Sequence, residues 1–390
     1  MVAALWGGCK EEGKFIYIDD SMPAPAQVTD VTVRNTPGGA VLYYKVPEDQ
    51  NLLYVQAVYE IQPGVQRECK SSYYKDSLVL EGFGDTRLYD VKLYSIGKNE
   101  KASEPLTVQV NPSLGPVHLA TTQMRDAFGG VSVSIENPER ASLAIILMGD
   151  TAKIGYQSYL ESFYTSAERA SFALRGLDTI QGNYSVYLRD RWNNLSDTTY
   201  ATLTPMYEEL IPKNTWQEVH LPTDSWEPLE GNAAYAIPRI WDGQTTSSMF
   251  SSTYDSPMPH WITWDLGINV IISRFKYWQR TANMWERSHL KIFEFYGSMN
   301  PNPDGSWDES WIPLGRFENV KPSQGTTVTA EDIAFGSAGV DFDLEMNEFA
   351  PNPFVPIRYV RLKCIETFNG PRLIDGMWVC EISFWGQILK

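Results

Sequence analysis

One stretch of this chain occurs twice, at a spacing that matches the length of a small β-sandwich domain. The first copy, GGAVLYYKVPE at residues 38–48, aligns without gaps to GGVSVSIENPE at residues 129–139. A second pair, YDVKLYSIGKN at 89–99 and YSVYLRDRWNN at 184–194, keeps nearly the same spacing. Because the offset is roughly 90 residues, about one sandwich domain, the repeat predicts a tandem pair of such domains.

The segments inside each copy alternate apolar and polar residues, as half-buried β-strands require. Examples are VTDVTV, AVLYYKV, LLYVQAVYE and LTVQV, and no amphipathic helix pattern of useful length interrupts them. We therefore expect Ig-like or fibronectin type III-like sandwiches at residues 25–112 and 113–205, acting mainly as spacers. The stretch RDRWNNLSD at 189–197 is interpreted as a turn and strand edge, although it contains a tryptophan and two aspartates.

The N-terminal segment, LWGGCKEE at residues 5–12, fits a packed strand poorly. Its two glycines weaken a strand, and its charged residues oppose burial. The segment resembles a bacterial lipobox, in which small residues precede a cysteine that becomes lipidated. This resemblance implies lipidation of Cys9, with residues 1–24 forming a signal remnant and an extended spacer. An ordinary frayed terminus is the alternative interpretation.

Charge, hydropathy and cysteine usage exclude several classes of function. A net charge of −16 repels phosphate backbones, so nucleic acid is not an expected partner. No apolar run approaches the roughly 20 residues of a membrane helix, so a lipid at Cys9 would be the only anchor. The chain has no CxxC or HExxH spacing, which argues against a zinc site. Whether Cys364 and Cys380 form a disulfide stays open.

A different set of motifs follows the linker at residues 206–222. In chain order these motifs are Asp242-Gly243, Trp261 with Asp265-Leu266-Gly267, Gly297-Ser298, and Glu381 with Gly386. Together they resemble the discoidin family, also called coagulation-factor type-C domains. The resemblance covers residues 223–390 and implies a β-sandwich jelly roll of about eight strands. The predicted fold class is therefore all-β: two tandem Ig-like or fibronectin type III-like sandwiches followed by a discoidin-like jelly roll.

The discoidin resemblance also implies a structural calcium ion where the Asp-Gly loop meets the last strand. Calcium prefers six to eight hard oxygen ligands, many of them backbone carbonyls. The positions that match the family's ligands are the side chains of Asp242, Ser247 and Glu381, with the carbonyls of Arg239, Gln244 and Cys380. The alternative is that Asp242 begins a tight turn with Gly243 and that Glu381 is an exposed strand residue.

Ligands of the discoidin fold bind at loops on one end of the sandwich. Two loops here, at residues 279–289 and 366–377, combine aromatic rings with planar polar groups. Aromatic rings stack on the apolar face of a sugar, and Arg, Asn and His serve its hydroxyls. The predicted ligand-binding residues are Arg280, Asn283, Trp285, Phe368, Asn369 and His260. In the alternative, Trp285 and Phe368 fold back and cap the sandwich.

The whole order of modules resembles the surface glycan-binding lipoproteins of bacterial polysaccharide-utilisation systems. This resemblance implies a non-catalytic, lipid-anchored protein on the outer membrane of a Gram-negative bacterium. The third module would capture polysaccharide or oligosaccharide, and glycan importer components of the outer membrane would be its protein partners. The acidic Glu11 and Glu12 resemble the signal that sends such lipoproteins to the outer face.

Two other classes of function compete with glycan binding: protein interaction and catalysis. A protein-interaction or adhesion lipoprotein with no glycan ligand is the main alternative, because Ig-like and discoidin-like domains also bind proteins. An enzyme is not expected. Glycoside hydrolysis needs two carboxylates at a fixed separation, and the acidic residues here are scattered over strand ends and turns.

Overall fold

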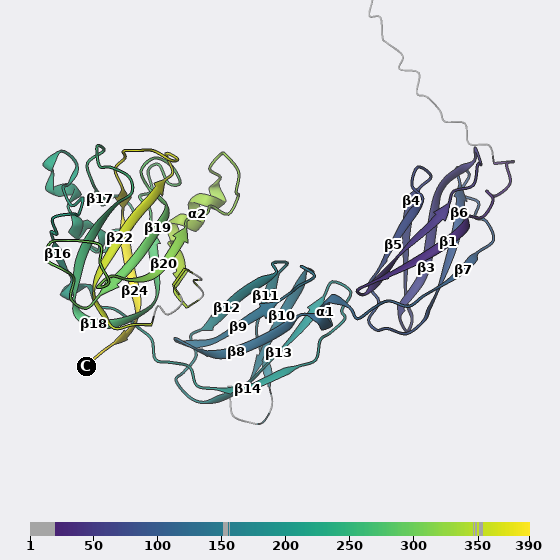
Figure 1. Cartoon of the computed structure of the whole chain (residues 1–390), viewed down its shortest axis with the longest axis horizontal. Helices are drawn as coiled ribbons and strands as arrows, with labels where there is room; N and C mark the ends of the chain where they lie inside the picture. Colours follow the sequence, from purple (N-terminus) through teal and green to yellow (C-terminus); the bar gives the residue numbers. More distant parts are fainter. Residues whose placement is uncertain (1–19, 151–154, 156, 346, 348, 351–353) are drawn as a thin grey trace, which may run out of the picture.

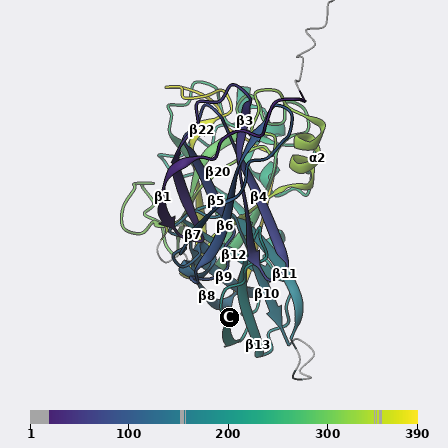
Figure 2. The same ribbon diagram turned by 90° about the vertical axis from the view of Figure 1, so that its right-hand side faces the viewer.

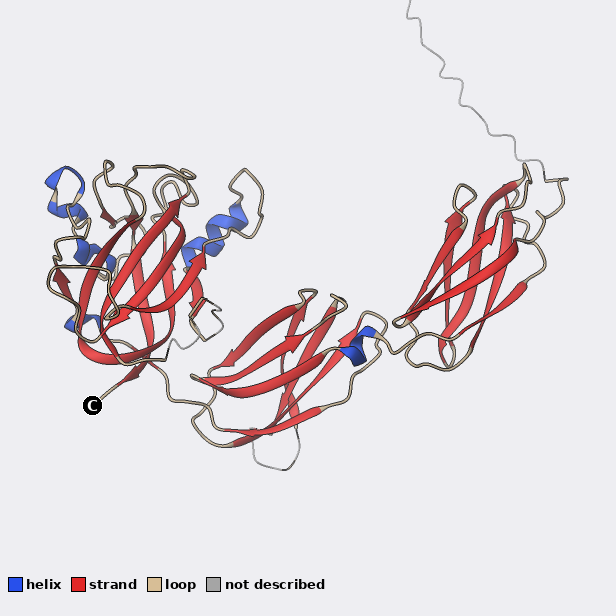
Figure 3. Ribbon diagram, in the orientation of Figure 1, coloured by secondary structure: helices blue, strands red, loops and turns tan. Residues whose placement is uncertain are grey.

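The computed structural model describes residues 20–150, 155, 157–345, 347, 349–350 and 354–390. Strands dominate this part of the chain, and helices are short (Figure 3). The strands form three β-sandwiches that follow one another along the long axis (Figure 1), and they lie one behind another when the molecule is turned by 90° (Figure 2). The all-β fold class predicted from the sequence is confirmed.

The first sandwich packs a three-stranded sheet against a four-stranded one. Its strands are β1 (Thr29–Thr36), β2 (Gly39–Lys45) and β5 (Ser77–Glu81) in one sheet, and β4 (Val65–Ser72), β3 (Leu52–Gln62), β6 (Tyr89–Gly97) and β7 (Leu106–Val110) in the other. Alternate side chains such as Leu42, Leu80 and Val91 are fully buried between the sheets. This burial explains the apolar and polar alternation in the sequence.

The second sandwich repeats this layout. A short helix, α1 (Pro116–Leu119), leads into the sheet of β8 (Thr121–Ala127), β9 (Gly130–Glu136) and β12 (Arg169–Arg175), and the facing sheet holds β11 (Ser158–Thr165), β10 (Leu143–Gly149), β13 (Gly182–Asp190) and β14 (Thr199–Leu203). The duplicated glycine pair forms the same hairpin turn in both sandwiches. Gly38 and Gly129 adopt φ angles of 60° and 64°, in the left-handed region that favours glycine.

The third sandwich has an eight-stranded sheet and a two-stranded one. In chain order its elements are β15 (Glu209–Leu210), η1 (Lys213–Thr215), β16 (Gln217–Val219), η2 (Leu229–Gly231), η3 (Ala233–Tyr235), η4 (Ile237–Ile240), β17 (Phe250–Ser251), β18 (His260–Trp278), β19 (Leu290–Ser298), β20 (Ile312–Glu318), α2 (Ala330–Ala338), β21 (Val340–Asp343), β22 (Ile357–Thr367), β23 (Trp378–Val379) and β24 (Glu381–Ile388). The core combines aliphatic side chains with a large group of aromatic ones, of which Trp264, Phe275, Phe295 and Phe384 are almost fully buried.

The turn after β13 joins the first two sandwiches. Asn194 in this turn is 6% exposed, and its amide donates to Gly82 O of the first sandwich and to Asp190 Oδ2 of its own. Gln62 of the first sandwich donates in turn to Asn194 Oδ1 at 2.8 Å. The stretch interpreted as a turn and strand edge is therefore also the polar joint between two domains.

A buried arginine joins the second and third sandwiches. Arg175, at the end of β12, lies against the carboxylates of Glu208, Asp343 and Glu345, and its side chain is only 17% exposed. Glu345 also accepts a hydrogen bond from Phe128 N at 3.0 Å. Charged groups buried together in this way fix the geometry of a contact, because each one needs its partners.

Candidate functional site

The two loops predicted to bind ligand meet at one end of the third sandwich. The buried carboxylate of Asp375 connects them: it accepts hydrogen bonds from Ser288 of the 279–289 loop and from Thr367 and Asn369 of the other loop. The three donor–acceptor distances lie between 2.7 and 3.0 Å. Both loops therefore belong to one hydrogen-bonded frame.

Trp285 does not present its ring to solvent, contrary to the predicted role in ligand binding. It is 4% exposed, and its indole N–H donates to Asp332 O at 3.0 Å beneath helix α2. Asn283, Trp285 and Arg287 adopt left-handed φ angles of 63°, 63° and 57°, so the backbone here does not follow a simple hairpin. The ring caps the sandwich, which is the alternative that the sequence had left open.

Phe368 and Asn369 serve mainly the interior of the loop frame. The ring of Phe368 is half-buried and lies edge-on to Trp285, with centroids 5.8 Å apart. The amide nitrogen of Asn369 donates to Asp375 at 2.9 Å and to Ser288 at 3.3 Å. Neither side chain is free to act as the open contact that the sequence predicted, although part of each remains accessible.

His260 is buried as well, which contradicts its predicted contact with ligand. It is 3% exposed at the start of β18, and its Nε2 lies 3.3 Å from Ser252 Oγ. Burial lowers the pKa of His260 to about 4, so the imidazole is neutral at physiological pH. The contact with Ser252 places the imidazole in the interior of the sandwich, beside the segment 251–259.

The exposed groups at this end come partly from a loop that the sequence analysis missed. The segment 251–259 lies beside the 366–377 loop, since Met258 N donates to Leu373 O at 2.9 Å. Its Tyr254 is 46% exposed and packs close to Gly376, so a Cβ on that glycine would lie 2.8 Å from the ring. An aromatic residue, Tyr254, within the turn-rich stretch SSTYDSPMP could have indicated this loop, because turns lie at the surface.

The predicted loops contribute other accessible groups at this end of the sandwich. Arg287 and Arg372 are exposed, whereas Arg280 and Asn283 are half-buried. The apolar tip of the 366–377 loop is open to solvent, with Leu373 87% and Ile374 56% exposed. The loop end thus offers an aromatic ring, planar nitrogen donors and an aliphatic tip.

A second group of tryptophans in this sandwich is organised around a buried cation. Arg361 is fully buried, pairs with Asp224 at 3.3 Å, and lies 4.1 to 5.9 Å from the ring centroids of Trp311, Trp307 and Trp261. Desolvation raises the pKa of Asp224 to about 6. These rings lie around the ion pair of Arg361 and Asp224: Trp311 is buried, Trp261 is half-buried, and Trp307 is 37% exposed.

The predicted calcium ligands lie where the Asp-Gly loop meets β24. Glu381 is 1% exposed, not an exposed strand residue, and its Oε2 accepts a hydrogen bond from Gly243 N at 3.1 Å. Its Oε1 pairs with the ammonium of Lys213, while burial raises the pKa of Glu381 to about 7. Asp242 pairs with Arg239 at 3.2 Å, and Ser247 is exposed. Among the described residues, no three His, Cys, Asp or Glu side chains are grouped to hold a metal.

The described cysteines, Cys69, Cys364 and Cys380, are free thiols. Cys380 lies at the Asp-Gly loop, where its Sγ donates to Ser248 O at 2.8 Å. Desolvation raises the pKa of Cys380 to about 12, so it stays protonated. The predicted lipid acceptor, Cys9, lies outside the described residues.

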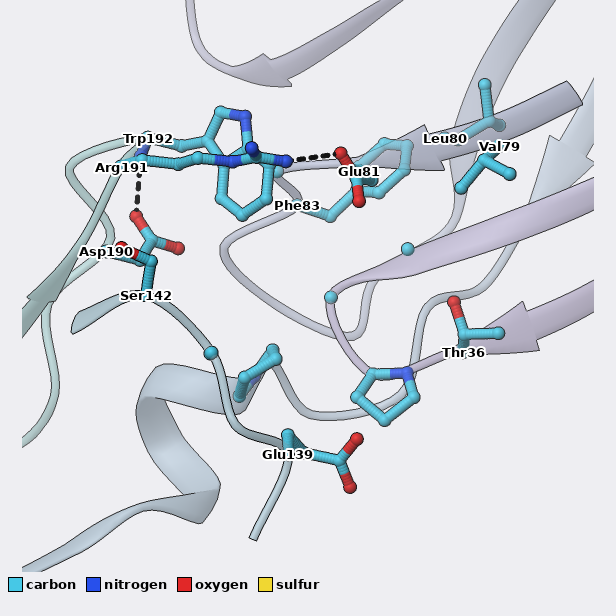
Figure 4. Close-up of a pocket in the computed structure, with 16 residues that line it drawn as sticks. Thr36, Val79, Leu80, Glu81, Phe83, Glu139, Ser142, Asp190, Arg191 and Trp192 are labelled. Atoms are coloured by element: carbon cyan, nitrogen blue, oxygen red, sulfur yellow. Dashed lines mark hydrogen bonds and ion pairs between the residues drawn. The ribbon is translucent and has the colours of Figure 1, made fainter. Parts of the chain in front are cut away.

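A cleft of about 350 Å³ separates the first two sandwiches (Figure 4). Glu81 and Arg191 close one side of it with an ion pair of 2.6 Å. The ring of Trp192 packs against Gly82, and the Arg191 guanidinium lies 4.2 Å from its centroid. Because both neighbours cover this ring, the cleft belongs to the joint between the domains and does not offer an open stacking face.

Three family models match consecutive parts of the chain. Each describes a domain of unknown function: DUF4959 matches residues 25–112, DUF5126 matches residues 115–214, and DUF5000 matches residues 241–386. No curated protein gives a significant match. In the part of the chain that the structure describes, no helix is both long and apolar enough to cross a membrane.

Several solved structures are similar to this chain. The SusE-like protein BT2857 shares 26% sequence identity, over 70% of this chain and 100% of that one, with a TM-score of 0.44. The module CBM32-3 from a family 31 glycoside hydrolase of Clostridium perfringens shares 14% identity, over 46% and 95% of the two chains, with a TM-score of 0.33. The C-terminal domain of a Bacteroides fragilis chitobiase shares 17% identity, over 47% and 100%, with a TM-score of 0.32.

Proposed function

We propose that this protein is a non-catalytic carbohydrate-binding protein that captures polysaccharide or oligosaccharide at the loop end of its third sandwich. The observation that carries the proposal is the exposed ring of Tyr254 at this end, beside the accessible Arg372 loop. A tyrosine ring offers an apolar face for stacking on a sugar and a hydroxyl for hydrogen bonding. Arginine and asparagine side chains supply planar donors for the sugar hydroxyls.

The loop frame favours binding because it is organised before a ligand arrives. The Asp375 carboxylate holds the loops at residues 279–289 and 366–377 together, and Trp285 fixes the first of them under helix α2. A ligand therefore need not order these loops, which lowers the entropic cost of binding. We propose that Arg280 and Asn283 contact the glycan directly. The role of the other predicted residues is to hold the loops in place: Trp285, Phe368, Asn369 and His260.

An open site with one exposed tyrosine binds weakly by itself. An affinity between micromolar and millimolar corresponds to about 4–8 kcal/mol. Many copies on one cell surface would bind a long polysaccharide more tightly, because binding of each further site becomes intramolecular. We propose that lipidation at Cys9 supplies this surface display on the outer membrane, next to components that import glycans. The two polar joints between the sandwiches support a spacer role for the first two domains.

Catalysis is not part of the proposal. The buried carboxylate at the loop end, Asp375, accepts hydrogen bonds from Ser288, Thr367 and Asn369, so it serves the frame. The proposed mechanism needs only stacking and hydrogen bonding. Release of reducing sugar from a polysaccharide that the protein binds would contradict this part of the proposal.

A protein-interaction role is the second candidate, and one observation favours it. Leu373 and Ile374 are 87% and 56% exposed at the tip of the 366–377 loop. Exposed aliphatic side chains suit an apolar protein surface better than a hydroxylated sugar. Replacing both with serine would abolish capture of a protein partner and leave glycan binding within a few-fold of its original strength.

Isothermal titration of the full chain against a panel of neutral and acidic polysaccharides tests the proposed function. We expect saturable heat with at least one of them. Silence with every polysaccharide, while tryptophan fluorescence reports a folded third sandwich, would contradict glycan binding. Fluorescence suits this control because every tryptophan except Trp6 and Trp192 lies within residues 216–385.

A further inference from the structure

The place where a calcium ion is predicted already contains a positive charge from the chain. The carboxylate of Glu381 is 1% exposed, and the ammonium of Lys213 pairs with its Oε1. Gly243 N donates to the other oxygen at 3.1 Å. Lys213 comes from η1, between β15 and β16 at the start of the third sandwich, so the pair joins the start of this sandwich to its last strand.

Both oxygens of the Asp242 carboxylate have hydrogen-bond donors too. Asp242 Oδ1 accepts from Gln244 N at 2.9 Å, and Asp242 Oδ2 accepts from Ser248 Oγ at 2.6 Å and from the Arg239 guanidinium at 3.2 Å. The carbonyl oxygen of Gln244, another predicted ligand, lies 3.3 Å from Cys380 Sγ, whose single S–H donates to Ser248 O at 2.8 Å. No oxygen of the two carboxylates is left without a partner.

This arrangement does not fit a calcium ion. Calcium needs six to eight oxygens directed at one point, whereas each carboxylate here is matched to a cationic side chain of its own. A cation entering beside Glu381 would meet the ammonium of Lys213 at close range, and like charges repel. The cation would also have to displace the N–H and O–H groups that donate hydrogen bonds to the carboxylates of Asp242 and Glu381.

We propose that Lys213 supplies the positive charge that the discoidin resemblance assigns to calcium, so that the third sandwich is stable without the metal. The lysine does more than neutralise Glu381. Its ammonium lies 5.9 Å from the centroid of the Trp216 ring, and β15 pairs with β24 just before it in the chain. The ion pair of Lys213 and Glu381 thus joins the segment after β15 to the last strand. This proposal does not depend on the proposed glycan binding.

Thermal unfolding of the full chain, followed by tryptophan fluorescence, tests this proposal directly. The protein is measured after treatment with EDTA and again in excess CaCl2. We expect the same Tm in both, within about 1 °C. A ligand that binds only the folded state raises Tm with its concentration. A saturable rise in the Tm of the unaltered protein with CaCl2 would overturn the proposal.

Lys213→Ala provides the second arm, with Lys291→Ala as the matched control. Lys291 also pairs with a carboxylate of the third sandwich, Glu366, but that carboxylate is 18% exposed whereas the Glu381 side chain is 2% exposed. We expect Lys213→Ala to lower Tm by about 5 °C or more and Lys291→Ala to lower it much less. Equal effects would overturn the proposal. If Lys213→Ala fails to fold, the Tm of the unaltered protein in EDTA and in CaCl2 still tests whether calcium stabilises the third sandwich.

Discussion

The indole N–H of Trp285 donates a hydrogen bond to the main-chain oxygen of Asp332, at 3.0 Å, and so ties the 279–289 loop to helix α2. We predict that Trp285→Ala lowers the free energy of unfolding of the third sandwich by about 3–5 kcal/mol, because it removes a large buried side chain. Trp285→Phe keeps an apolar ring and should cost clearly less. Urea denaturation of both variants checks this. A loss of glycan binding at unchanged stability would mean that Trp285 contacts ligand after all.

The burial of His260 predicts a pH dependence of stability. Its pKa falls from the ordinary value of 6.5 to about 4 in the folded state, so protons favour the unfolded chain. The contribution of neutral, buried His260 to the free energy of unfolding is therefore complete above pH 6.5 and is lost as the pH falls towards 4. The groups facing it are Ser252, the carboxylate of Asp375 and, on the paired strand, Cys364.

Lowering the pKa of His260 from 6.5 to about 4 should change the free energy of unfolding by about 3 kcal/mol over this pH range. Urea denaturation at several pH values measures it, with His260→Gln as the comparison. The variant should be less stable at pH 7 but should lose less stability on acidification. An identical slope in the two proteins would show that His260 does not carry the pH dependence.

The polar joint between the first two sandwiches depends on Asn194. We predict that Asn194→Ala loosens this joint, because it leaves Gly82 O and the amide of Gln62 without their partners, at about 1–3 kcal/mol each. Small-angle X-ray scattering should show a broader distribution of interdomain distances. Asn183→Ala is the control, since Asn183 is exposed and its side-chain oxygen accepts a hydrogen bond from Thr202 within the second sandwich. Indistinguishable scattering from the two variants would contradict a role for Asn194 in the joint.

Arg175 has the corresponding role between the second and third sandwiches. Its removal takes the shared cation from Asp343 and Glu345, whereas Glu208 still pairs with Arg274 at 3.1 Å. We expect Arg175→Met to destabilise this contact by about 3–5 kcal/mol and to expose the linker at 206–222 to protease. Arg140→Met is the control, because that arginine forms an exposed ion pair with Glu168 in the second sandwich. Equal rates of linker cleavage in both variants would contradict the prediction.

Much of the fold could be predicted because its signals are local. The duplicated glycine pair at Gly38 and Gly129 requires a left-handed turn in each sandwich, and alternation marks the strands on both sides. The Asp-Gly motif at Asp242 does meet the last strand at Glu381, as the resemblance implied. These features depend on neighbours in the chain or on the order of motifs.

The candidate site was harder to predict because exposure depends on distant residues. Nothing near Trp285 in the sequence shows that helix α2 covers its ring, or that three left-handed residues reshape its loop. The close packing of the Tyr254 ring against Gly376 joins two segments that are far apart in the chain. Lys213 was assigned to a linker, and its pairing with Glu381 joins residues far apart in the chain.

The most direct test compares glycan affinity in Tyr254→Ala and Tyr200→Ala, measured by isothermal titration with a polysaccharide that the unaltered protein binds. Tyr200 is 72% exposed on β14 of the second sandwich, so it controls for loss of any surface tyrosine. We expect Tyr254→Ala to weaken binding about tenfold or more, roughly 1.4 kcal/mol, with Tm unchanged, and Tyr200→Ala to bind normally. Equal affinities in both variants and the unaltered protein would contradict the assignment of the sugar site to this loop end.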